Sequence, residues 1–486
     1  MGIMKLKYDY PIIVIGAGAG GLVVAIGAAK AGKKVLLIEK GTYGGDCTNF
    51  GCIPSKSLIA AAHASHTIHH GKKYGLLYDI AGFESSGALE RTRDIVQHIL
   101  DEEDPEALGK MGVETLTGMA SFQDPYTLQV VTSDGEERQI TGDQIVIATG
   151  SHPYIPPIPG LDLIPYHTNE TIFDLSEVPK KLVVIGGGPI GSELAQAFHR
   201  LGSKVTILQH GKHILAREEE MTQDVMEEQF RKEGIELYLH HETLQADMNE
   251  GEICLEIQNH DTEQRQFITG SHVLVSVGRR PNLGSLNLKN VGIKVYDRGI
   301  CVDDYGRTSQ KNVWAVGDVA GHAIFTHVAE NEARTVLTNL LLPWPLRFKL
   351  DRKQAIPRVT FTDPEVASVG LNEEQAKKDF GESKIAVYMF PFDKLDRAIT
   401  TERTEGFVKI VTKKWSSKIL GATIVAPRAG EMLSQITTAM RGGIALRKLA
   451  SLIHPYPTYS LAIRKCADMW LTQTVLPSLK KWIGKS

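Results

Sequence analysis

The sequence contains one glycine-rich pattern twice, each time directly after a short run of β-branched residues. The copies span residues 13–21 and 183–191, and after each the chain continues with a helical stretch and a second apolar run. A strand, a tight turn, a helix and a returning strand make a βαβ unit. The repeat predicts an α/β chain with two Rossmann-like dinucleotide-binding domains, followed by a C-terminal α+β region.

The glycines of each copy have separate tasks. The first permits the turn, the second lets the backbone approach a pyrophosphate, and the third lets the helix pack on its strand. The helix N-terminus then offers free N–H groups to the phosphates. One such motif is weak evidence, whereas two copies in the same context are strong evidence for dinucleotide binding. The glycines concerned are Gly16, Gly18, Gly21, Gly186, Gly188 and Gly191.

The two copies differ at the end of the second strand, where the first has Glu39 and the second has Gln209. A carboxylate there accepts hydrogen bonds from ribose hydroxyls, as expected for FAD or NAD. The second copy has no carboxylate to repel a ribose 2′-phosphate, and His210 and Lys212 lie nearby. We therefore expect NADP(H) to be favoured over NAD(H), although both cations also suit a solvated loop.

Composition restricts the partners. The 486 residues are 42% hydrophobic and 23% charged, with a formal net charge of −3. This balance is typical of a soluble, multidomain enzyme and argues against nucleic acid or an anionic membrane as partner. Residues 11–29 lack charge, but their glycine turn favours a buried strand–turn–helix over a membrane span or a signal peptide. We expect a cytoplasmic protein with a solvated basic tail.

Two of the five cysteines form the most informative segment. Cys47 and Cys52 are separated by four residues, so both thiols can lie on one face near a helix start. A helix N-terminus favours the thiolate, and the second ligand pair of a zinc site is missing. We expect a redox-active pair and no bound metal, while Cys254, Cys301 and Cys466 fit small buried hydrophobes.

Several motifs in a fixed order resemble the class I pyridine nucleotide–disulfide oxidoreductases, which include mercuric reductase, dihydrolipoamide dehydrogenase and glutathione reductase. The similarity covers almost the whole chain. It rests on the following segments: the two glycine motifs with Glu39 and Glu193, residues 44–56 with the cysteine pair, Ala148-Thr149-Gly150, residues 278–282, Gly317-Asp318, and residues 361–365.

The resemblance implies roles for individual residues. Cys47 matches the thiol that attacks the substrate, and Cys52 matches the thiol that contacts the flavin. Lys56 and Glu193 match an ion pair beside the flavin, and Asp318 matches the residue that holds the ribityl chain. The expected cofactor contacts also include Lys40, Gly45, Thr48, Lys56, Thr149, Gly150, Gln209, His210, Gly278 and Arg279.

The resemblance also implies the domain order and a homodimer. We expect an FAD-binding domain at 1–150, an NAD(P)-binding domain at 151–280, a return to the FAD domain at 281–350, an interface domain at 351–475 and a tail at 476–486. The interface domain is expected to bring Tyr456 of one subunit near Cys47 of the other.

The chain departs from the family where disulfide reductases carry a His–Glu acid pair. Tyr456 takes the place of the histidine and Leu461 that of the glutamate. A phenol with a pKa of about 10 is a poor proton shuttle near neutral pH, and leucine is none. His454 is a possible substitute, although a local structural role suits it better.

Losing the acid changes the expected acceptor. A disulfide releases a thiolate that needs a proton, whereas a thiolate-bound soft metal ion exchanges ligands. Mercuric reductase-like proteins also have tyrosine here, so a metal-ion or related small-molecule acceptor is the leading hypothesis. A dihydrolipoamide dehydrogenase or glutathione-type reductase and a flavin redox sensor that serves a partner protein stay open. His63, His66 and His70 could share a helix face as a metal dock, or be a solvated face.

Overall fold

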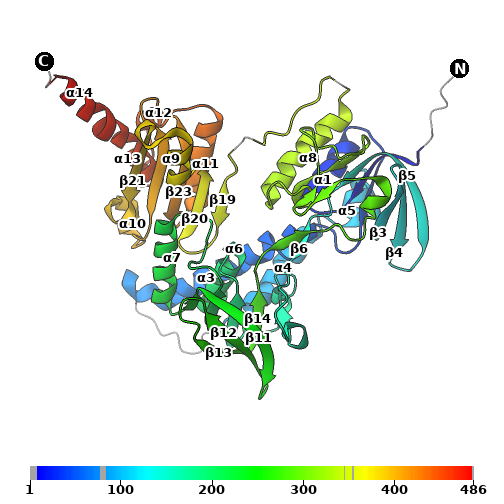
Figure 1. The fold of residues 1–486 in the computed structure, drawn as a ribbon, viewed down its shortest axis with the longest axis horizontal. Coiled ribbons are helices and arrows are strands. Elements are labelled where there is room, and N and C mark those ends of the chain that lie inside the picture. The colour runs from blue at the N-terminus through cyan, green and yellow to red at the C-terminus, as the bar shows by residue number, and fades with distance from the viewer. Residues whose placement is uncertain (1–7, 77–83, 344, 353–354, 484–486) are drawn as a thin grey trace. The chain divides into compact units, whose positions relative to one another are not determined.

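The computed structural model describes residues 8–76, 84–343, 345–352 and 355–483, and it divides into two compact units (Figure 1). Unit 1 comprises the described parts of Met1–Pro157, Pro165–Val178 and Leu274–Arg352. Unit 2 comprises the described parts of Ile158–Ile164, Pro179–Val273 and Lys353–Ser486. Each unit therefore contains one copy of the repeated glycine motif.

Unit 1 is built on a mixed sheet. Five strands run parallel in the order β3–β2–β1–β5–β18, and β4 pairs antiparallel with both β3 and β5. The strands are β1 (Tyr10–Ile15), β2 (Val35–Glu39), β3 (Glu114–Asp124), β4 (Thr127–Thr132), β5 (Glu137–Ile147) and β18 (Val313–Ala315). Because β18 pairs with β5, the chain returns to the first sheet late in the sequence.

Apolar strand runs form the core of unit 1, as expected for parallel strands covered on both faces. Ile13 and Val14 of β1 are fully buried and point to opposite sides of the sheet. Helices α1 (Ala19–Lys30) and α8 (Thr326–Leu341) pack together. They touch so closely that a Cβ on Gly27 would lie 2.2 Å from Leu337.

Shorter elements complete unit 1. The helices are α2 (Gly45–Asn49), α3 (Cys52–His70), α4 (Gly87–Leu100) and α5 (Pro105–Lys110), and the 3₁₀ turns are η1 (Gly71–Tyr74), η3 (Ile172–Asp174), η4 (Leu288–Val291) and η5 (Gly317–Ala320). The short strands are β6 (Ser151–Pro153), β7 (Tyr166–His167), β15 (Arg279–Pro281), β16 (Val295–Tyr296) and β17 (Gly299–Ile300). The strand β14 (His272–Val275) crosses the boundary between the units.

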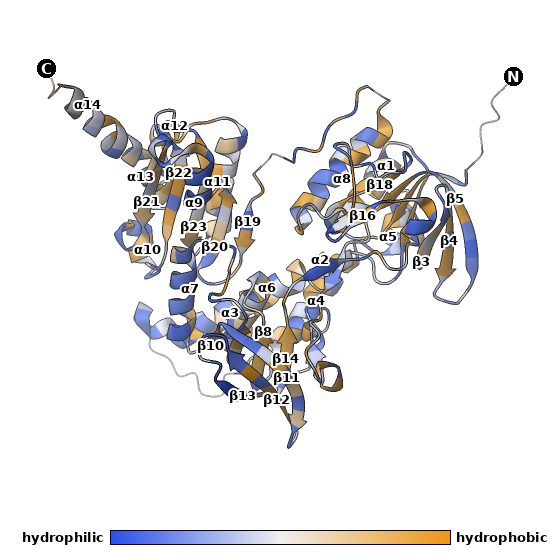
Figure 2. Ribbon diagram, viewed as in Figure 1, coloured by the Kyte–Doolittle hydropathy of each residue, from blue (hydrophilic) through white to orange (hydrophobic). Residues whose placement is uncertain are grey.

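Unit 2 begins with the second βαβ copy. Strands β8 (Lys181–Ile185), β9 (Lys204–Gln209) and β10 (Glu236–Leu239) are parallel, and they are connected by α6 (Pro189–Arg200) and α7 (Glu220–Glu233). A three-stranded antiparallel sheet follows, made of β11 (His241–Asn249), β12 (Glu252–Asn259) and β13 (Arg265–Gly270). Figure 2 shows α7 mostly in blue, in keeping with its many charged residues.

The rest of unit 2 is a five-stranded antiparallel sheet in the order β19–β20–β23–β22–β21, with helices packed against it. The strands are β19 (Arg358–Thr360), β20 (Glu365–Gly370), β21 (Ile385–Pro391), β22 (Phe407–Lys413) and β23 (Ile419–Ala426). The helical elements are η2 (Leu161–Leu163), α9 (Glu373–Phe380), η6 (Glu382–Lys384), η7 (Phe392–Lys394), α10 (Asp396–Thr400), α11 (Ala429–Arg441), α12 (Leu446–Ala450), α13 (Leu461–Met469), the π-helical η8 (Trp470–Val475) and α14 (Leu476–Ile483).

The two βαβ copies make the same backbone hydrogen bond at the first glycine of the turn, which confirms the repeat. The Gly16 amide donates to the Ile38 carbonyl at 2.8 Å, and the Gly186 amide donates to the Leu208 carbonyl at 2.8 Å. The predicted α/β fold class with a C-terminal α+β region is therefore confirmed. None of the helices in the described part of the chain is both long enough and apolar enough to span a membrane.

Candidate redox-active site

The cysteine pair lies at the junction of two helices of unit 1. Cys47 is in the middle of the short helix α2, whereas Cys52 is the first residue of α3 and follows the N-cap Gly51. Neither cysteine forms a disulfide in this structure; Cys52 is exposed and Cys47 is half-buried. The structure thus differs from the expected single helix face, because a turn at Phe50 and Gly51 separates the two helices.

The two thiols interact directly. A hydrogen bond to Cys52, together with burial, raises the pKa of Cys47 above its ordinary value. The Thr326 hydroxyl at the start of α8 lies 3.7 Å from Cys52 Sγ and partly offsets this rise. Cys47 therefore holds its proton more tightly than an ordinary thiol. The lowered pKa expected from a helix start does not apply to Cys47, since its partner thiol outweighs the helix.

A half-buried arginine, Arg279, connects the cysteine segment to the rest of unit 1. Arg279 Nη2 lies 2.8 Å from the carboxylate of Asp46, the residue before Cys47. The same guanidinium donates to the Ser151 hydroxyl at 2.8 Å and to the Ser151 carbonyl at 2.9 Å. Asn169 joins the group by donating to Asp46 at 3.2 Å and to the Phe50 carbonyl at 3.1 Å.

The network extends to the predicted ribityl-binding residue. The Ser151 hydroxyl donates to Asp318 at 2.6 Å. Burial raises the pKa of Asp318, while Ser151 and the charge of Arg279 act in the opposite direction. A chain of contacts from Asp46 through Arg279 and Ser151 thus reaches Asp318. The sequence motifs include Arg279 and Asp318 but not Ser151, Asn169 or Thr326. Ser151 directly follows the Ala148-Thr149-Gly150 motif, whereas Asn169 and Thr326 lie outside the motifs.

The first glycine turn fits a dinucleotide. Gly16 has φ +104°, and a Cβ there would lie 2.4 Å from the Ala148 carbonyl oxygen. A Cβ on Gly45 would lie 2.4 Å from Gly18 Cα, so the cysteine segment approaches this turn backbone to backbone. Glu39 accepts from the Ala17 amide at 2.7 Å. These features suit a pyrophosphate at the turn and a ribose at Glu39.

The second glycine turn repeats this arrangement in unit 2. Gln209 accepts from the Gly187 amide at 2.8 Å, as Glu39 does from Ala17. Helix α6 begins at Pro189 after the extended N-cap Gly188, where a Cβ would meet open space. The turn therefore also fits a dinucleotide, with an amide side chain at the ribose position in place of a carboxylate.

The other residues predicted to contact the cofactors lie in different environments. Thr149 exchanges hydrogen bonds of 2.8 Å with Asn282, and Gly150 accepts from the Asn282 amide. The Gly278 carbonyl accepts from the Tyr154 amide. Thr48 is buried, and Lys40 is exposed. The cofactor roles of these residues stay predictions.

The expected ion pair of Lys56 and Glu193 joins residues of different units and stays a prediction. Lys56 lies in the first turns of α3, on the same helix as Cys52. Glu193 is buried in α6 and accepts from the Phe361 amide at 2.8 Å. That hydrogen bond connects α6 to the segment before β20 within unit 2.

The C-terminal segment lacks an acid pair at the matched positions. The hydrogen bond to Asp396 raises the pKa of Tyr456, whose side chain is 71% exposed. Leu461 is buried in the core of unit 2. His454 contacts the Leu452 carbonyl at 3.0 Å and the Gln435 amide at 3.0 Å. These contacts favour the structural role expected for His454.

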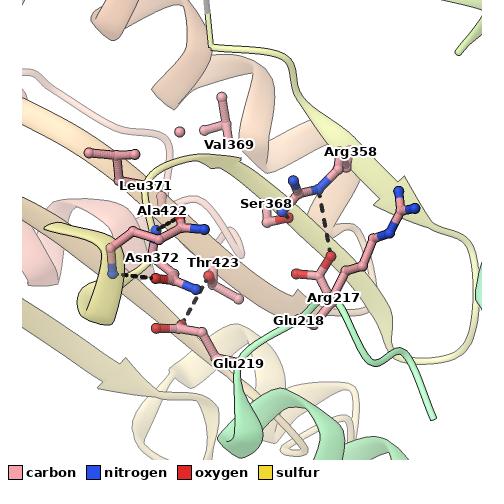
Figure 3. Close-up of a pocket in the computed structure, with 12 residues that line it drawn as sticks. Arg217, Glu218, Glu219, Arg358, Ser368, Val369, Leu371, Asn372, Ala422 and Thr423 are labelled. Atoms are coloured by element: carbon pink, nitrogen blue, oxygen red, sulfur yellow. Dashed lines mark hydrogen bonds and ion pairs between the residues drawn. The ribbon is translucent and has the colours of Figure 1, made fainter. Parts of the chain in front are cut away.

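Two further features stand apart from these residues. His66 and His70 stack with their ring centroids 4.0 Å apart, and among the described residues no group suited to hold a metal ion is found. A polar pocket of about 340 Å³ in unit 2 is lined by Arg217, Glu218, Glu219 and Arg358 among others (Figure 3). The Arg358 guanidinium lies 3.7 Å from Glu218, and none of the predicted site residues lines this pocket.

Comparison with known proteins agrees with this arrangement. Residues 10–333 match the pyridine nucleotide-disulphide oxidoreductase family, and residues 356–467 match its dimerisation domain. A mercuric reductase of Streptomyces lividans is 35% identical over 471 residues, which cover 96% of this chain and 97% of the relative. A dihydrolipoyl dehydrogenase of Geobacillus stearothermophilus is 36% identical over 466 residues, which cover 94% and 96%.

Solved structures give the same result. The HOCl-induced flavoprotein disulfide reductase RclA from Escherichia coli aligns with a TM-score of 0.84 and 28% identity, covering 95% of this chain and 100% of RclA. A Cu(II) complex of RclA aligns with a TM-score of 0.85. The two glycine turns, the thiol pair and these similarities lead to one conclusion. The chain belongs to the pyridine nucleotide-disulphide oxidoreductase family, and it is a flavoenzyme that uses FAD and a pyridine nucleotide.

Proposed function

We propose that this oxidoreductase passes electrons from NADPH through the flavin and the Cys47–Cys52 pair to a thiolate-bound soft metal ion. The direct hydrogen bond between the two thiols carries the proposal. Two sulfurs in contact can open and close one S–S bond, which stores one electron pair.

FAD, when bound, supplies the step that converts a hydride from the nicotinamide into an electron pair for the disulfide. The residues of this chain carry out the remaining steps. Two electrons and two protons turn the Cys47–Cys52 disulfide into two thiols, which release their protons when they bind the ion. The thiolates then bind the ion, and its two-electron reduction re-forms the S–S bond. The Arg279–Asp46 pair fixes the backbone that presents Cys47.

The C-terminal residues favour a metal ion over a disulfide. Cleavage of a substrate disulfide releases a thiolate, which needs an acid with a pKa near neutral pH. Tyr456 has its pKa raised further from that range, and Leu461 is buried and apolar. Reduction of a thiolate-bound ion requires ligand exchange and no such acid. The similarity to mercuric reductases supports this assignment.

A second candidate is a disulfide reductase or dihydrolipoamide dehydrogenase that works with an altered acid. The dihydrolipoyl dehydrogenase relative is as similar as the mercuric reductase relative, which keeps this candidate open. A third is a flavin redox sensor whose partner protein is the acceptor. It predicts bound FAD without steady-state turnover of any small acceptor.

We further propose a preference for NADPH, a homodimer and a cytoplasmic location. Gln209 in place of a carboxylate, with His210 and Lys212 beside it, supports NADPH. The match to the dimerisation domain supports the homodimer, which a native mass at micromolar concentration tests. Five cysteines without a disulfide framework fit a reducing compartment.

A screen of NADPH and NADH oxidation with the purified holoenzyme tests the acceptor assignment and the nucleotide assignment together. Its acceptors are Hg(II) with excess thiol, Cu(II) without added thiol, lipoamide, glutathione disulfide and quinones. We expect thiol-bound metal ions to be reduced fastest and Tyr456→His to raise turnover of the disulfides. Turnover of lipoamide or glutathione disulfide far above that of the metal ions would contradict the metal-ion assignment. A clear NADH preference would contradict the nucleotide assignment.

A further inference from the structure

The polar pocket of unit 2 is lined by parts of the chain that are distant in sequence (Figure 3). Residues 217–219, which lead into α7, form one part of the lining. Arg358 of β19, the end of β20 with the residues after it, and β23 form the rest. The volume of about 340 Å³ lies in the range of small-molecule sites. None of the twelve lining residues is a cysteine or a histidine, so a ligand there is bound without being reduced.

Two neighbouring carboxylates at this pocket are equally buried but differ in their partners. The side chains of Glu218 and Glu219 are 12% and 13% exposed. Glu219 accepts from Lys409 Nζ at 3.0 Å and from the Thr423 hydroxyl at 3.2 Å. In the described part of the chain, no group donates a hydrogen bond to the Glu218 carboxylate, and its one ion pair is a 3.7 Å contact with Arg358 Nε. A nearly buried carboxylate without a donor is costly, so Glu218 is suited to accept from a ligand.

The two arginines of the pocket have N–H groups without partners. Arg358 Nη2 donates to the Ser368 hydroxyl at 3.0 Å. Its Nε is buried and makes no hydrogen bond to any described residue, because 3.7 Å to Glu218 is too long for one. Arg217 is exposed, and within residues 8–76, 84–343, 345–352 and 355–483 it has neither a hydrogen bond nor an ion pair. Both guanidinium groups can therefore donate to an anion.

Side-chain amides supply further donors. Figure 3 shows Asn372 on the opposite side of the drawn residues from the two arginines. The Asn372 side-chain oxygen accepts from the Gln375 amide at 2.8 Å, and the Gln375 side-chain oxygen accepts from the Asn372 amide at 3.2 Å. This capping box at the start of α9 uses both oxygens and leaves both side-chain NH₂ groups for a ligand. Val369 and Ala422 add an apolar surface to the lining.

These groups restrict the chemistry of the ligand. Four donor side chains require a molecule rich in acceptors, whereas Glu218 requires a hydroxyl or ammonium donor on the same molecule. The lining residues carry two positive and two negative charges, and Glu219 is already compensated by Lys409. One positive charge is therefore left over, which favours an anion. Two carboxylates on a short carbon chain can reach the guanidinium groups and the amide groups together.

We propose that this pocket binds a small dicarboxylate that carries a hydroxyl or an ammonium group. One carboxylate binds Arg217 and Arg358, and the hydroxyl or ammonium group donates to Glu218. The second carboxylate accepts from the side-chain NH₂ groups of Asn372 and Gln375. The site includes neither a glycine turn nor the cysteine pair, so it is independent of the proposed electron acceptor and nucleotide.

Calorimetric titration of the holoenzyme with three ligands of one carbon skeleton tests the site. L-malate carries the hydroxyl group, L-aspartate carries the ammonium group and succinate carries neither. We expect L-malate or L-aspartate to bind about tenfold more tightly than succinate, because only these two can donate to Glu218. The tighter of the two shows which donor Glu218 prefers.

Two variants separate the contributions of the charged groups. Glu218→Met removes the acceptor and should bring the three affinities within about twofold of one another, while retained succinate binding shows that the pocket is intact. Arg217→Met should weaken the binding of all three ligands about tenfold. Arg231→Met is the matched control, because Arg231 is an exposed arginine of α7 outside the pocket, and it should behave like the wild type.

Three outcomes would overturn the proposal. The first is that none of the three ligands binds the holoenzyme at millimolar concentration. The second is that succinate binds the wild type as tightly as L-malate and L-aspartate do, since Glu218 then accepts nothing from the ligand. The third is wild-type affinity in Arg217→Met, which would place the ligands elsewhere on the protein.

Discussion

The guanidinium of Arg279 lies 2.8 Å from the carboxylate of Asp46, although 232 residues lie between them in the chain and Asp46 directly precedes Cys47. Arg279 is 10% exposed at its side chain, and its other hydrogen bonds go to Ser151 and Asn169. The position of Cys47 thus depends on a residue outside the cysteine motif.

Replacing this arginine should weaken the cysteine segment. Arg279→Ala leaves the Asp46 carboxylate without its cation and Asp318 with less compensation, so we expect a stability loss of about 2 kcal/mol and reduced FAD retention. Asp46→Asn, which keeps hydrogen-bonding groups, should cost less. Urea unfolding and flavin absorbance of both variants measure this, and wild-type values for Arg279→Ala would contradict the role of the network.

Removing one thiol should change the acidity of the other. The hydrogen bond to Cys52 raises the pKa of Cys47, so Cys52→Ser should lower the pKa of Cys47 toward the ordinary thiol value of about 8.5. The pH dependence of iodoacetamide alkylation of the reduced apoprotein reports this value. Alkylation of Cys47 in the Cys52→Ser variant that begins only at strongly alkaline pH would contradict the assignment.

Glu365 gives unit 2 a predictable pH dependence. Burial raises the pKa of Glu365 from 4.5 to about 7, while the Gly430 amide, 2.9 Å away, acts in the opposite direction. The folded protein holds this proton more tightly than the unfolded chain, so the stabilisation is complete below a pH of about 4.5 and is lost as the pH rises to about 7.

Glu365→Gln keeps the shape and removes this titration. Between pH ~5 and ~8 the wild type should lose up to about 3 kcal/mol relative to the variant. Denaturant unfolding of both proteins at several pH values measures the difference. A constant difference across this range would show that Glu365 does not titrate near neutral pH in the folded protein.

The buried charges of unit 2 offer a matched comparison. Arg200 is 3% exposed and lies 2.7 Å from both Glu233 and Asp363, while Arg403 also contacts Asp363. Arg200→Ala leaves two buried carboxylates short of a cation and should cost about 3–5 kcal/mol.

Arg231→Ala is the control, because Arg231 is 53% exposed in its pair with Glu227. It should cost at most about 0.5 kcal/mol. Thermal or urea unfolding measures the loss of stability in both variants. Equal losses would show that burial does not determine how much these ion pairs contribute to stability.

The glycine repeat could be predicted from the sequence because its physical requirements are local. A turn that needs φ +104° at Gly16 and the close contact of Gly21 with the Gly16 carbonyl leave glycine as the only fitting residue. The apolar runs around these turns likewise fix the parallel strands. The α/β fold class therefore follows from short segments.

The supports of the cysteine pair could not be predicted in the same way. Thr326 is brought to Cys52 by α8, and Asn169 reaches Asp46 from a loop without a motif. The break between α2 and α3 also depends on packing, since the Cys47–Cys52 spacing alone is compatible with one helix face. Contacts between distant segments require the tertiary fold, which no local pattern encodes.

We propose above all that Cys47 and Cys52, next to a bound flavin, form a disulfide that is reversibly reduced and re-formed. An anaerobic titration of the purified yellow holoenzyme with NADPH, with thiols counted before reduction, after reduction and after reoxidation, tests it most directly. We expect two thiols per chain to appear with reduction and to disappear with reoxidation, and neither change to occur in Cys47→Ser or Cys52→Ser. Protein without a yellow chromophore, or a thiol count that stays constant through the cycle, would contradict it.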